Sequence, residues 1–230
     1  MKILTIDTSS NCSSVALSDG ASLLGECILG EDRCHSGRLM DSISSLLAAA
    51  GLTPDGLDAL AVSLGPGSFT GVRVGIATVK GLALAIGKPV VGFSSLAMLA
   101  MNLPFSSAQV APMFDARKGE VYAGLYRCTS LPEPLTPDAV LSPERFLAAI
   151  DTPTVFVGEG ALRYRELISS TLGELALFSP WHAASPRAGA GAVIALDAAL
   201  KGDFTPLALL NPTYLRASEA EVAKRRRESL

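Results

Sequence analysis

The sequence predicts an α/β protein made of two related lobes, each with a mixed sheet flanked by helices. In each half an apolar strand ends in an aspartate, at Asp7 and at Asp115, and a polar turn then leads into a second strand. Helical and strand patterns alternate after each of these pairs, which is typical of helices packed on a sheet. Because this order occurs twice, we expect a first lobe over residues 1–104 and a smaller second lobe, with a C-terminal tail, over residues 105–230.

Length and composition provide a large core and exclude several classes of protein. Of the 230 residues 49% are hydrophobic, and the net charge of −3 lacks the basic surplus of a protein that grips nucleic acid alone. The four cysteines show no C-x-x-C spacing, so neither a zinc ribbon nor a disulfide framework is indicated. The apolar run in the opening MKILTID is too short for a signal peptide. Arg73 and Lys80 interrupt the most apolar later stretch, so we expect a cytoplasmic protein with no membrane partner.

The stretch from residue 64 to residue 87 is the most informative part of the chain. A turn built from Gly65, Pro66 and Gly67 follows an apolar run and leads into a helix that Ser68 or Thr70 can cap. One face of this helix is apolar at the spacing of a single stripe, with Val72, Ile76, Val79, Ala83 and Ile86. The sequence therefore predicts a strand, a glycine turn and an amphipathic helix.

Gly71 and Gly75 lie one turn apart on a second, smooth face of the same helix. Each glycine costs about 1 kcal/mol relative to alanine inside a helix, so we expect another helix or a ligand to approach closely there. A glycine turn that opens a helix can also hold phosphate. The spacing matches neither a P-loop nor G-x-G-x-x-G, and a tight turn with helix packing is the alternative interpretation.

The first 50 residues predict a three-stranded meander followed by a helix. Strands over 2–7, 12–18 and 22–29 are joined by polar turns, and the helix runs from Ser36 to Ala50. Asp7 either faces Mg²⁺ or phosphate, or closes an Asx turn with the N–H of Ser9 or Ser10. The helix has an apolar face, and Met40 beside it widens the stripe towards a partner; the face comprises Leu39, Ile43, Leu46, Leu47 and Ala50.

The rest of the chain continues the alternation. Its expected strands cover residues 89–93, 109–114, 120–127 and 154–157, and its expected helices cover residues 96–102, 142–150, 164–172 and 188–200. A turn is expected at residues 158–160. This order fits the ribonuclease-H-like unit of the actin, Hsp70 and sugar-kinase superfamily, in which an aspartate and glycine turns hold ATP.

Several motifs together resemble the TsaB family, also called YeaZ. They are Asp7-Thr8-Ser9, GPGSFTGVRVG at 65–75, GLALA at 81–85, DARKGEVY at 115–122 and YLR at 214–216. The resemblance covers nearly the whole chain and implies the actin-like ATPase fold. It also implies that the protein is required to make N6-threonylcarbamoyladenosine (t6A) in the anticodon loop of tRNA. The implied partners are the catalytic paralogue TsaD and the ATPase TsaE, with tRNA reached through the complex.

The same resemblance predicts a subunit without catalysis of its own. TsaD-like proteins carry a His-x-x-x-His metal motif where this chain has Ser95 and Leu99, and neither side chain replaces an imidazole ligand. We therefore expect neither a bound metal nor catalytic residues. The rival hypothesis is a free-standing, ATP-dependent small-molecule kinase that uses Asp7 for Mg²⁺ and Asp115 as base.

Two sets of site residues follow from this interpretation. We expect the two long helices to form a four-helix contact with the paralogue, and to pair with a second copy when the paralogue is absent, through Leu39, Met40, Ile43, Gly71, Val72, Arg73, Gly75 and Ile76. A nucleotide or phosphate loop would comprise Asp7, Thr8, Ser9, Gly65, Gly67 and Ser68. The chain alone is expected to need no cofactor, with ATP or ADP at the partner boundary as the alternative. Lys224–Arg227 (KRRR) is either a solvated tail or a contact with tRNA phosphates.

Overall fold

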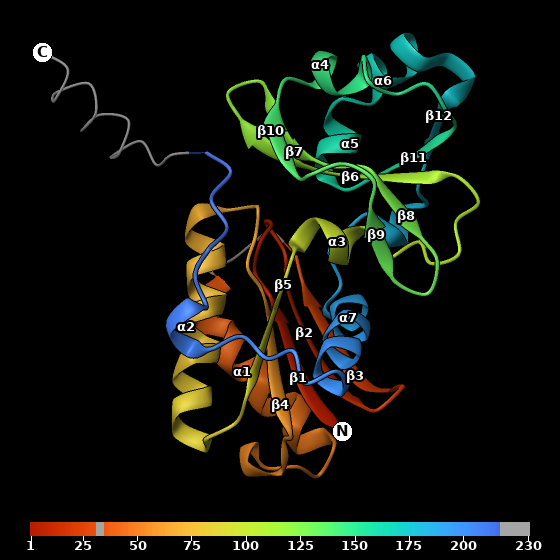
Figure 1. Ribbon diagram of the computed structural model, residues 1–230. Helices are drawn as coiled ribbons and strands as arrows, with labels where there is room; N and C mark the ends of the chain where they lie inside the picture. The colour runs from red at the N-terminus through yellow and green to blue at the C-terminus, as the bar shows by residue number, and fades with distance from the viewer. Residues whose placement is uncertain (31–34, 217–230) are drawn as a thin grey trace, which may run out of the picture.

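The computed structural model describes residues 1–30 and 35–216, so the KRRR segment lies outside the described residues. Two lobes are each built around a sheet (Figure 1). The first sheet has the order β3-β2-β1-β4-β5 and comprises β1 (Lys2–Asp7), β2 (Ser13–Asp19), β3 (Ser22–Leu29), β4 (Ala59–Ser63) and β5 (Val90–Phe93). Strands β1 to β3 form the expected antiparallel meander, and β4 lies parallel to both β1 and β5. The mixed sheet is confirmed.

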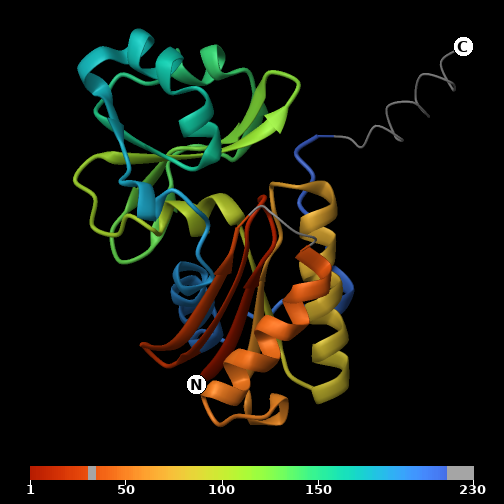
Figure 2. The same ribbon diagram turned by 180° about the vertical axis from the view of Figure 1, so that it is seen from behind.

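Helices cover both faces of the first sheet. α1 (His35–Ala49) and α2 (Phe69–Ile86) lie on one face, and α7 (Ala188–Leu200) lies on the other (Figures 1 and 2). Side chains alternate along β1, so that Leu4 joins the core under α1 and α2 while Ile3 joins the core under α7. The expected apolar stripes of both long helices are part of the first of these cores.

The second lobe holds a sheet of seven strands with short helices around it. Its main path is β10-β7-β6-β11-β12, and the strands are β6 (Gln109–Arg117), β7 (Glu120–Ala123), β8 (Tyr126–Cys128), β9 (Pro132–Pro134), β10 (Ala139–Leu141), β11 (Thr154–Val157) and β12 (Ala176–Phe178). The α-helices are α4 (Pro143–Leu147), α5 (Glu159–Arg163) and α6 (Arg165–Leu172). α3 (Ser95–Ala100) joins the lobes, because Leu96 and Leu99 pack with Phe114 of β6.

Four short 3-10 helices complete the described secondary structure. They are η1 (Pro54–Gly56), η2 (Gly173–Leu175), η3 (Trp181–Ala183) and η4 (Leu207–Leu209).

The structure corrects three expectations. The predicted strand over 120–127 is broken into β7 and β8, because the chain leaves β7 after Ala123 and β8 pairs with β9. A helix, α5, begins where a turn was expected, since Gly160 packs closely on Met113 of β6. The prediction that the whole of residues 105–230 belongs to the second lobe is also wrong. α7 and the segment after it return to the first sheet, where Gly191 packs closely against Phe93.

By length and composition alone, α2 could cross a membrane, since it has 18 residues with a mean hydropathy of 1.5. The expectation that Arg73 and Lys80 make this stretch fall short of a span is therefore not upheld. The core helix of a soluble protein passes the same test, and α2 packs Val72, Ile76 and Val79 against the first sheet.

Candidate functional site

The start of α2 is fastened to the turn between β1 and β2. Ser68 caps the helix, and its Oγ accepts a hydrogen bond from the N–H of Gly71 at 3.2 Å. The Ser68 N–H donates to the carbonyl oxygen of Ser9 at 2.7 Å, and the Thr8 hydroxyl donates to the carbonyl oxygen of Gly71 at 2.7 Å. On the other side of the glycine turn, the N–H of Ser95 in α3 donates a hydrogen bond to the carbonyl oxygen of Gly65. The glycine turn, the β1–β2 turn and α3 therefore form one hydrogen-bonded unit.

The glycines of this stretch make the fastening sterically feasible. A Cβ atom built on Gly67 or Gly71 would lie under 3.0 Å from the carbonyl oxygen of Ser9 or Thr8, and one built on Gly75 would lie 2.5 Å from Thr8 Oγ1. Close approach at Gly71 and Gly75 was expected, but the element that approaches is the β1–β2 turn of the same chain. The expectation of a second chain's helix at these two glycines is therefore corrected.

Three backbone donors near the glycine turn are already used within the chain. The Ser9 N–H donates to Asp7 Oδ1 at 3.2 Å, which is the Asx turn weighed as an alternative. The N–H groups of Ser68 and Gly71 are also bonded within the chain. The N–H groups of Ser9, Ser68 and Gly71 are therefore not free to hold a phosphate. A nucleotide site that includes Asp7, Thr8 and Gly65 stays a prediction.

Asp7 is a buried carboxyl group with an incomplete set of partners. Its Oδ1 also accepts a short hydrogen bond from the Ser63 hydroxyl, while Oδ2 is buried and has no hydrogen-bond partner. Burial raises the pKa of Asp7, and the hydrogen bonds from Ser63 and Ser9 oppose that shift only in part. The carboxyl group therefore holds the β1–β2 turn through these hydrogen bonds, and its ionisation lowers the stability of the fold because the charge is buried.

A cleft of about 300 Å³ separates the two lobes beside this unit. Its first-lobe wall includes Ser9, Gly67 and Phe69, and its second-lobe wall includes Asp115 and Arg117. Asp115 and Arg117, at the end of β6, therefore line the cleft.

Asp115 does not stand as a free base in this cleft. Arg163 Nη1 donates to Asp115 Oδ2 at 3.0 Å, and the N–H of Arg117 donates to Asp115 Oδ1 at 2.9 Å. Both oxygens of the carboxylate are therefore already engaged within the chain. This geometry gives no support to the kinase hypothesis.

The eight residues expected at a partner interface divide into two groups. The six that line the core of the first lobe are buried within the chain: Leu39, Ile43, Gly71, Val72, Gly75 and Ile76. Met40 and Arg73 are exposed and remain available to a partner. The six buried residues pack within their own lobe, and an interface with the paralogue stays a prediction.

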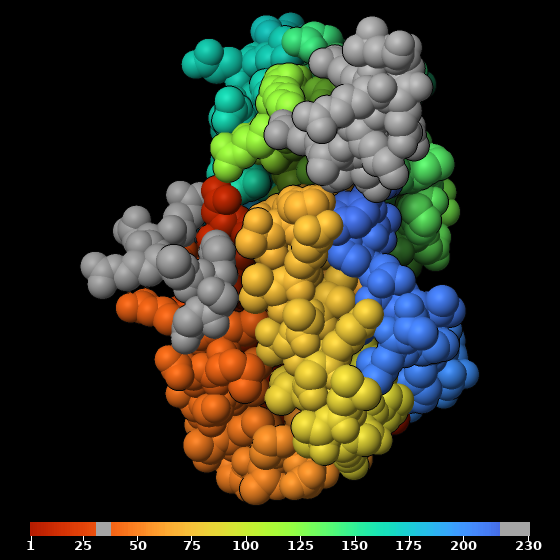
Figure 3. Space-filling view, turned by 90° about the vertical axis from the view of Figure 1, so that its left-hand side faces the viewer, coloured from red at the N-terminus to blue at the C-terminus, as the bar shows by residue number. Residues whose placement is uncertain are grey.

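The outer face of α2 is a smooth surface that sequence reasoning did not single out. We call Thr70, Ala77, Gly81, Leu84 and Ala85 the outer face of α2, and all five are exposed. Leu84 is 74% exposed, and a Cβ atom built on Gly81 would meet no heavy atom within 4 Å. Figure 3 shows α2 open along its length between α1 and the C-terminal segment. These residues lie opposite the core stripe at the same spacing of three and four residues, so the sequence carries a signal for this face.

An aromatic and cationic cluster closes the upper end of this surface. The Arg73 guanidinium lies 3.7 Å from the centre of the Phe69 ring, and its Nε donates to the Tyr214 hydroxyl at 2.7 Å. Two residues on, Arg216 forms an ion pair with Glu120 and donates to the carbonyl oxygen of Ala116 at 2.9 Å. The C-terminal segment therefore connects α2 of the first lobe to the β6–β7 turn of the second.

The two positions that match the metal motif of TsaD-like proteins lie in α3. Ser95 and Leu99 are both fully buried, and the Ser95 hydroxyl donates a short hydrogen bond to the carbonyl oxygen of Pro66. Ser95 thus has a structural role in holding the glycine loop. Among the described residues no group of three or more His, Cys, Asp or Glu side chains could hold a metal ion.

Two sheet-based lobes around a cleft, with an aspartate on the first strand of each, define the class as the actin-like ATPase fold. A family model described as "TsaD: tRNA N6-adenosine threonylcarbamoyltransferase" matches residues 29–224. The tRNA threonylcarbamoyladenosine biosynthesis protein TsaB of Bacillus subtilis is 33% identical over 225 residues, which cover 96% of each chain. The chain belongs to the TsaB family, and its role lies in t6A biosynthesis.

Other relatives agree with this assignment. TsaB of Escherichia coli is 37% identical over 129 residues, 55% of each chain. The structure of YeaZ from Pseudomonas aeruginosa superposes with a TM-score of 0.82 at 32% identity, covering 93% of this chain and 99% of that one. Component A of (R)-2-hydroxyglutaryl-CoA dehydratase from Acidaminococcus fermentans has a TM-score of 0.53 at 14% identity, covering 87% and 99%, and shows the fold alone.

Proposed function

We propose that this chain is the non-catalytic partner subunit of a TsaD-type threonylcarbamoyltransferase, in the cytoplasm, and that it binds this paralogue through the outer face of α2. The observation that carries the proposal is an 18-residue helix whose inner stripe is buried while its outer face is smooth and exposed. Small residues such as Ala77 and Gly81 let a facing helix approach closely, and the exposed Leu84 adds apolar area. Met40 of α1 and Arg73 of α2 are exposed as well and would add to this surface.

The proposal of a non-catalytic role rests on the identity and packing of two side chains. Ser95 and Leu99 occupy the positions of the paralogue's histidines. The Ser95 hydroxyl holds the glycine loop, and Leu99 is fully buried. Neither group serves as an imidazole ligand, so the chemistry would fall to the paralogue. The TsaE-type ATPase and tRNA would join through the complex. ATP or ADP, where it is needed, would bind at the boundary with the paralogue.

The experiment is a pull-down and titration of the purified chain with a TsaD-type paralogue. Leu84→Glu places a charge on the outer face of α2, whereas Leu162→Glu, the matched control, places the same charge on an exposed leucine of α5. Burying an unpaired carboxylate costs about 2 kcal/mol or more, so we expect Leu84→Glu to weaken binding at least about 30-fold. Leu162→Glu should leave the affinity unchanged. Equal affinities for both variants would remove α2 from the interface.

A further inference from the structure

The chain passes between the two lobes twice, once after α3 and once before α7. The two passages are tied together, because Asn102 Nδ2 donates to the carbonyl oxygens of Ala183 and Ser185 at 2.8 and 2.7 Å. Ser94, at the start of α3, also donates from its hydroxyl to Asp138 of the second lobe at 2.8 Å. Covalent connections and hydrogen bonds thus hold the lobes together beside α3, which makes this side of the molecule the natural hinge.

A third connection runs over the start of α2 (Figures 1 and 3). We call residues 210–216 the strap. Leu210 is fully buried in the core under α1 and α2, and the Thr213 N–H donates to the carbonyl oxygen of the residue after β4 at 2.7 Å. Tyr214 then accepts the hydrogen bond from Arg73 and lies against the first turn of α2. Up to Tyr214 the strap is therefore fixed to the first lobe.

Arg216 carries the strap across to the second lobe. It forms an ion pair with Glu120 of β7, and its Nη1 donates to the carbonyl oxygen of Ala116 in β6 at 2.9 Å. Ala116 lies between Asp115 and Arg117, which line the cleft between the lobes. Opening the cleft about the hinge therefore has to break the contacts of Arg216, and we call these contacts the latch.

We propose that the strap couples occupancy of the outer face of α2 to the width of the cleft between the lobes, with Arg216 as the latch. The proposal rests on the proposed function, because the TsaD-type paralogue is the occupant. The rings of Phe69 and Tyr214 are 45% and 46% exposed, and they lie beside Thr70 at the start of the outer face of α2. A helix that packs along this face covers both rings and holds the strap in place. Arg216 then stays against Glu120, and the cleft stays narrow.

This coupling works in both directions, because the two binding events share one free energy. In the structure Arg216 is already against Glu120, so the strap is fixed at both ends before a partner binds. A strap that is already fixed loses less freedom when the paralogue covers it. Loss of the latch should therefore widen the cleft and also weaken binding of the paralogue, although Arg216 lies outside the outer face of α2.

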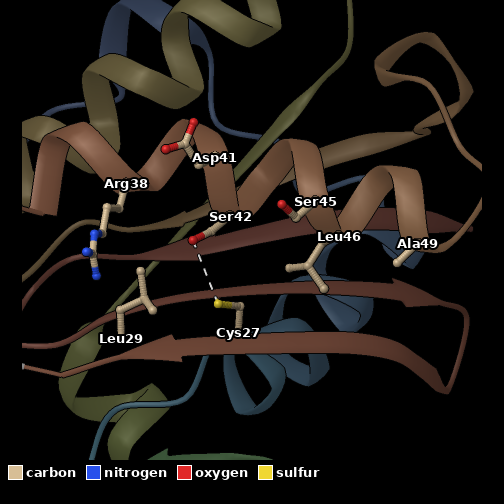
Figure 4. Close-up of a pocket in the computed structure, with 8 residues that line it drawn as sticks. All are labelled: Cys27, Leu29, Arg38, Asp41, Ser42, Ser45, Leu46 and Ala49. Atoms are coloured by element: carbon tan, nitrogen blue, oxygen red, sulfur yellow. Dashed lines mark hydrogen bonds between the residues drawn. The ribbon is translucent and has the colours of Figure 1, made fainter.

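A second hollow in the molecule provides a reference that this movement leaves unchanged. A groove of about 420 Å³ lies between β3 and α1, where the Cys27 thiol is 3.7 Å from the Ser42 hydroxyl (Figure 4). Both elements belong to the first lobe, so the groove keeps its shape when the lobes move apart. The cleft has walls from both lobes instead, with Ser9 on one wall and Tyr122 on the other.

The test measures how fast a maleimide labels a cysteine placed in the cleft by Tyr122→Cys, as a ratio to the rate at Cys27 of the same chain. Labelling follows the population of the open form. Arg216→Glu sets two carboxylates against each other, so we expect it to raise the ratio about tenfold or more. Adding Glu120→Arg to this variant reverses both charges and should restore the ratio. The matched control is Arg127→Glu, which breaks an ion pair within the second lobe and should leave the ratio unchanged.

The second measurement is the affinity for the TsaD-type paralogue, in chains that keep Tyr122. Arg216→Glu should weaken binding about fivefold or more, and the charge-reversed pair should bind as the wild type does. An unchanged labelling ratio with Arg216→Glu would overturn the latch. So would a raised ratio that Glu120→Arg fails to restore, or an equal rise with Arg127→Glu. A ratio that rises while the affinity stays the same would overturn the coupling.

These results are separable from the proposed function. Labelling needs this chain alone, so it judges the latch even where the paralogue fails to bind, which would remove the proposed function. Leu84→Glu should weaken paralogue binding and leave the labelling ratio unchanged, because Leu84 lies near the other end of α2. A paralogue that binds the wild type and Arg216→Glu equally well would leave the proposed function standing and remove the coupling.

Discussion

The packing of α2 on the β1–β2 turn predicts opposite effects for two glycine-to-alanine substitutions in the same helix. At Gly81 a Cβ atom meets open space, so Gly81→Ala should raise the free energy of unfolding by about 1 kcal/mol, the helix propensity of alanine over glycine. At Gly75 the new Cβ lies 2.5 Å from Thr8 Oγ1, far inside ordinary contact. Thr8 cannot simply turn away, because its hydroxyl is bonded to the carbonyl oxygen of Gly71.

The expected cost at Gly75 combines these terms. Overpacking costs about 1–3 kcal/mol and loss of the Thr8 hydrogen bond about 1 kcal/mol, against a gain of about 1 kcal/mol in helix propensity. Gly75→Ala should therefore lower the free energy of unfolding by about 1–3 kcal/mol. Urea unfolding of both variants, with melting temperatures that shift by about 2–4 °C per kcal/mol, measures the difference. Equal stabilities for Gly75→Ala and Gly81→Ala would refute the packing of α2 on Thr8.

Three further predictions follow from the described contacts. The raised folded-state pKa of Asp7 means that its contribution to stability is complete below the unfolded value of 3.8 and is lost as the pH rises through the folded-state value. Asp7→Asn should therefore gain stability relative to the wild type in urea unfolding as the pH rises above 3.8, and an offset that does not change with pH would contradict this. Arg216→Ala removes the ion pair with Glu120 and the hydrogen bond to the carbonyl oxygen of Ala116, so it should lower the free energy of unfolding by about 1–2 kcal/mol, and a loss above about 3 kcal/mol in the same assay would contradict this. Tyr214→Phe keeps the ring beside Arg73 but removes its hydroxyl, and a change in unfolding free energy above about 1.5 kcal/mol would be too large for that one exposed hydrogen bond.

The sequence was most informative where the determinants of structure are local. The meander of β1 to β3 and the bounds of β11 and α7 depend on neighbours within a few residues, and each was predicted. The cap of α2 is Ser68, one of the two candidates. The fold class followed because the strand and aspartate pattern occurs twice.

Contacts between distant residues could not be predicted in the same way. Gly75 predicted that another group approaches the helix closely, but no nearby residue in the sequence identifies that group as Thr8. Arg73 and Tyr214 are 141 residues apart, and no local pattern connects them. The return of α7 to the first sheet depends on small residues that fit over β5, so the boundary between the lobes required the tertiary structure.

The central claim is that this chain contributes a surface, not chemistry, to t6A formation. The most direct measurement is the amount of threonylcarbamoyladenosine formed on tRNA in a reconstituted reaction with a TsaD-type paralogue, a TsaE-type ATPase and a supply of the threonylcarbamoyl adenylate. We expect product with the wild-type chain and the paralogue together, none with the chain alone, and a large loss with Leu84→Glu. Product formed by this chain without the paralogue would contradict the account.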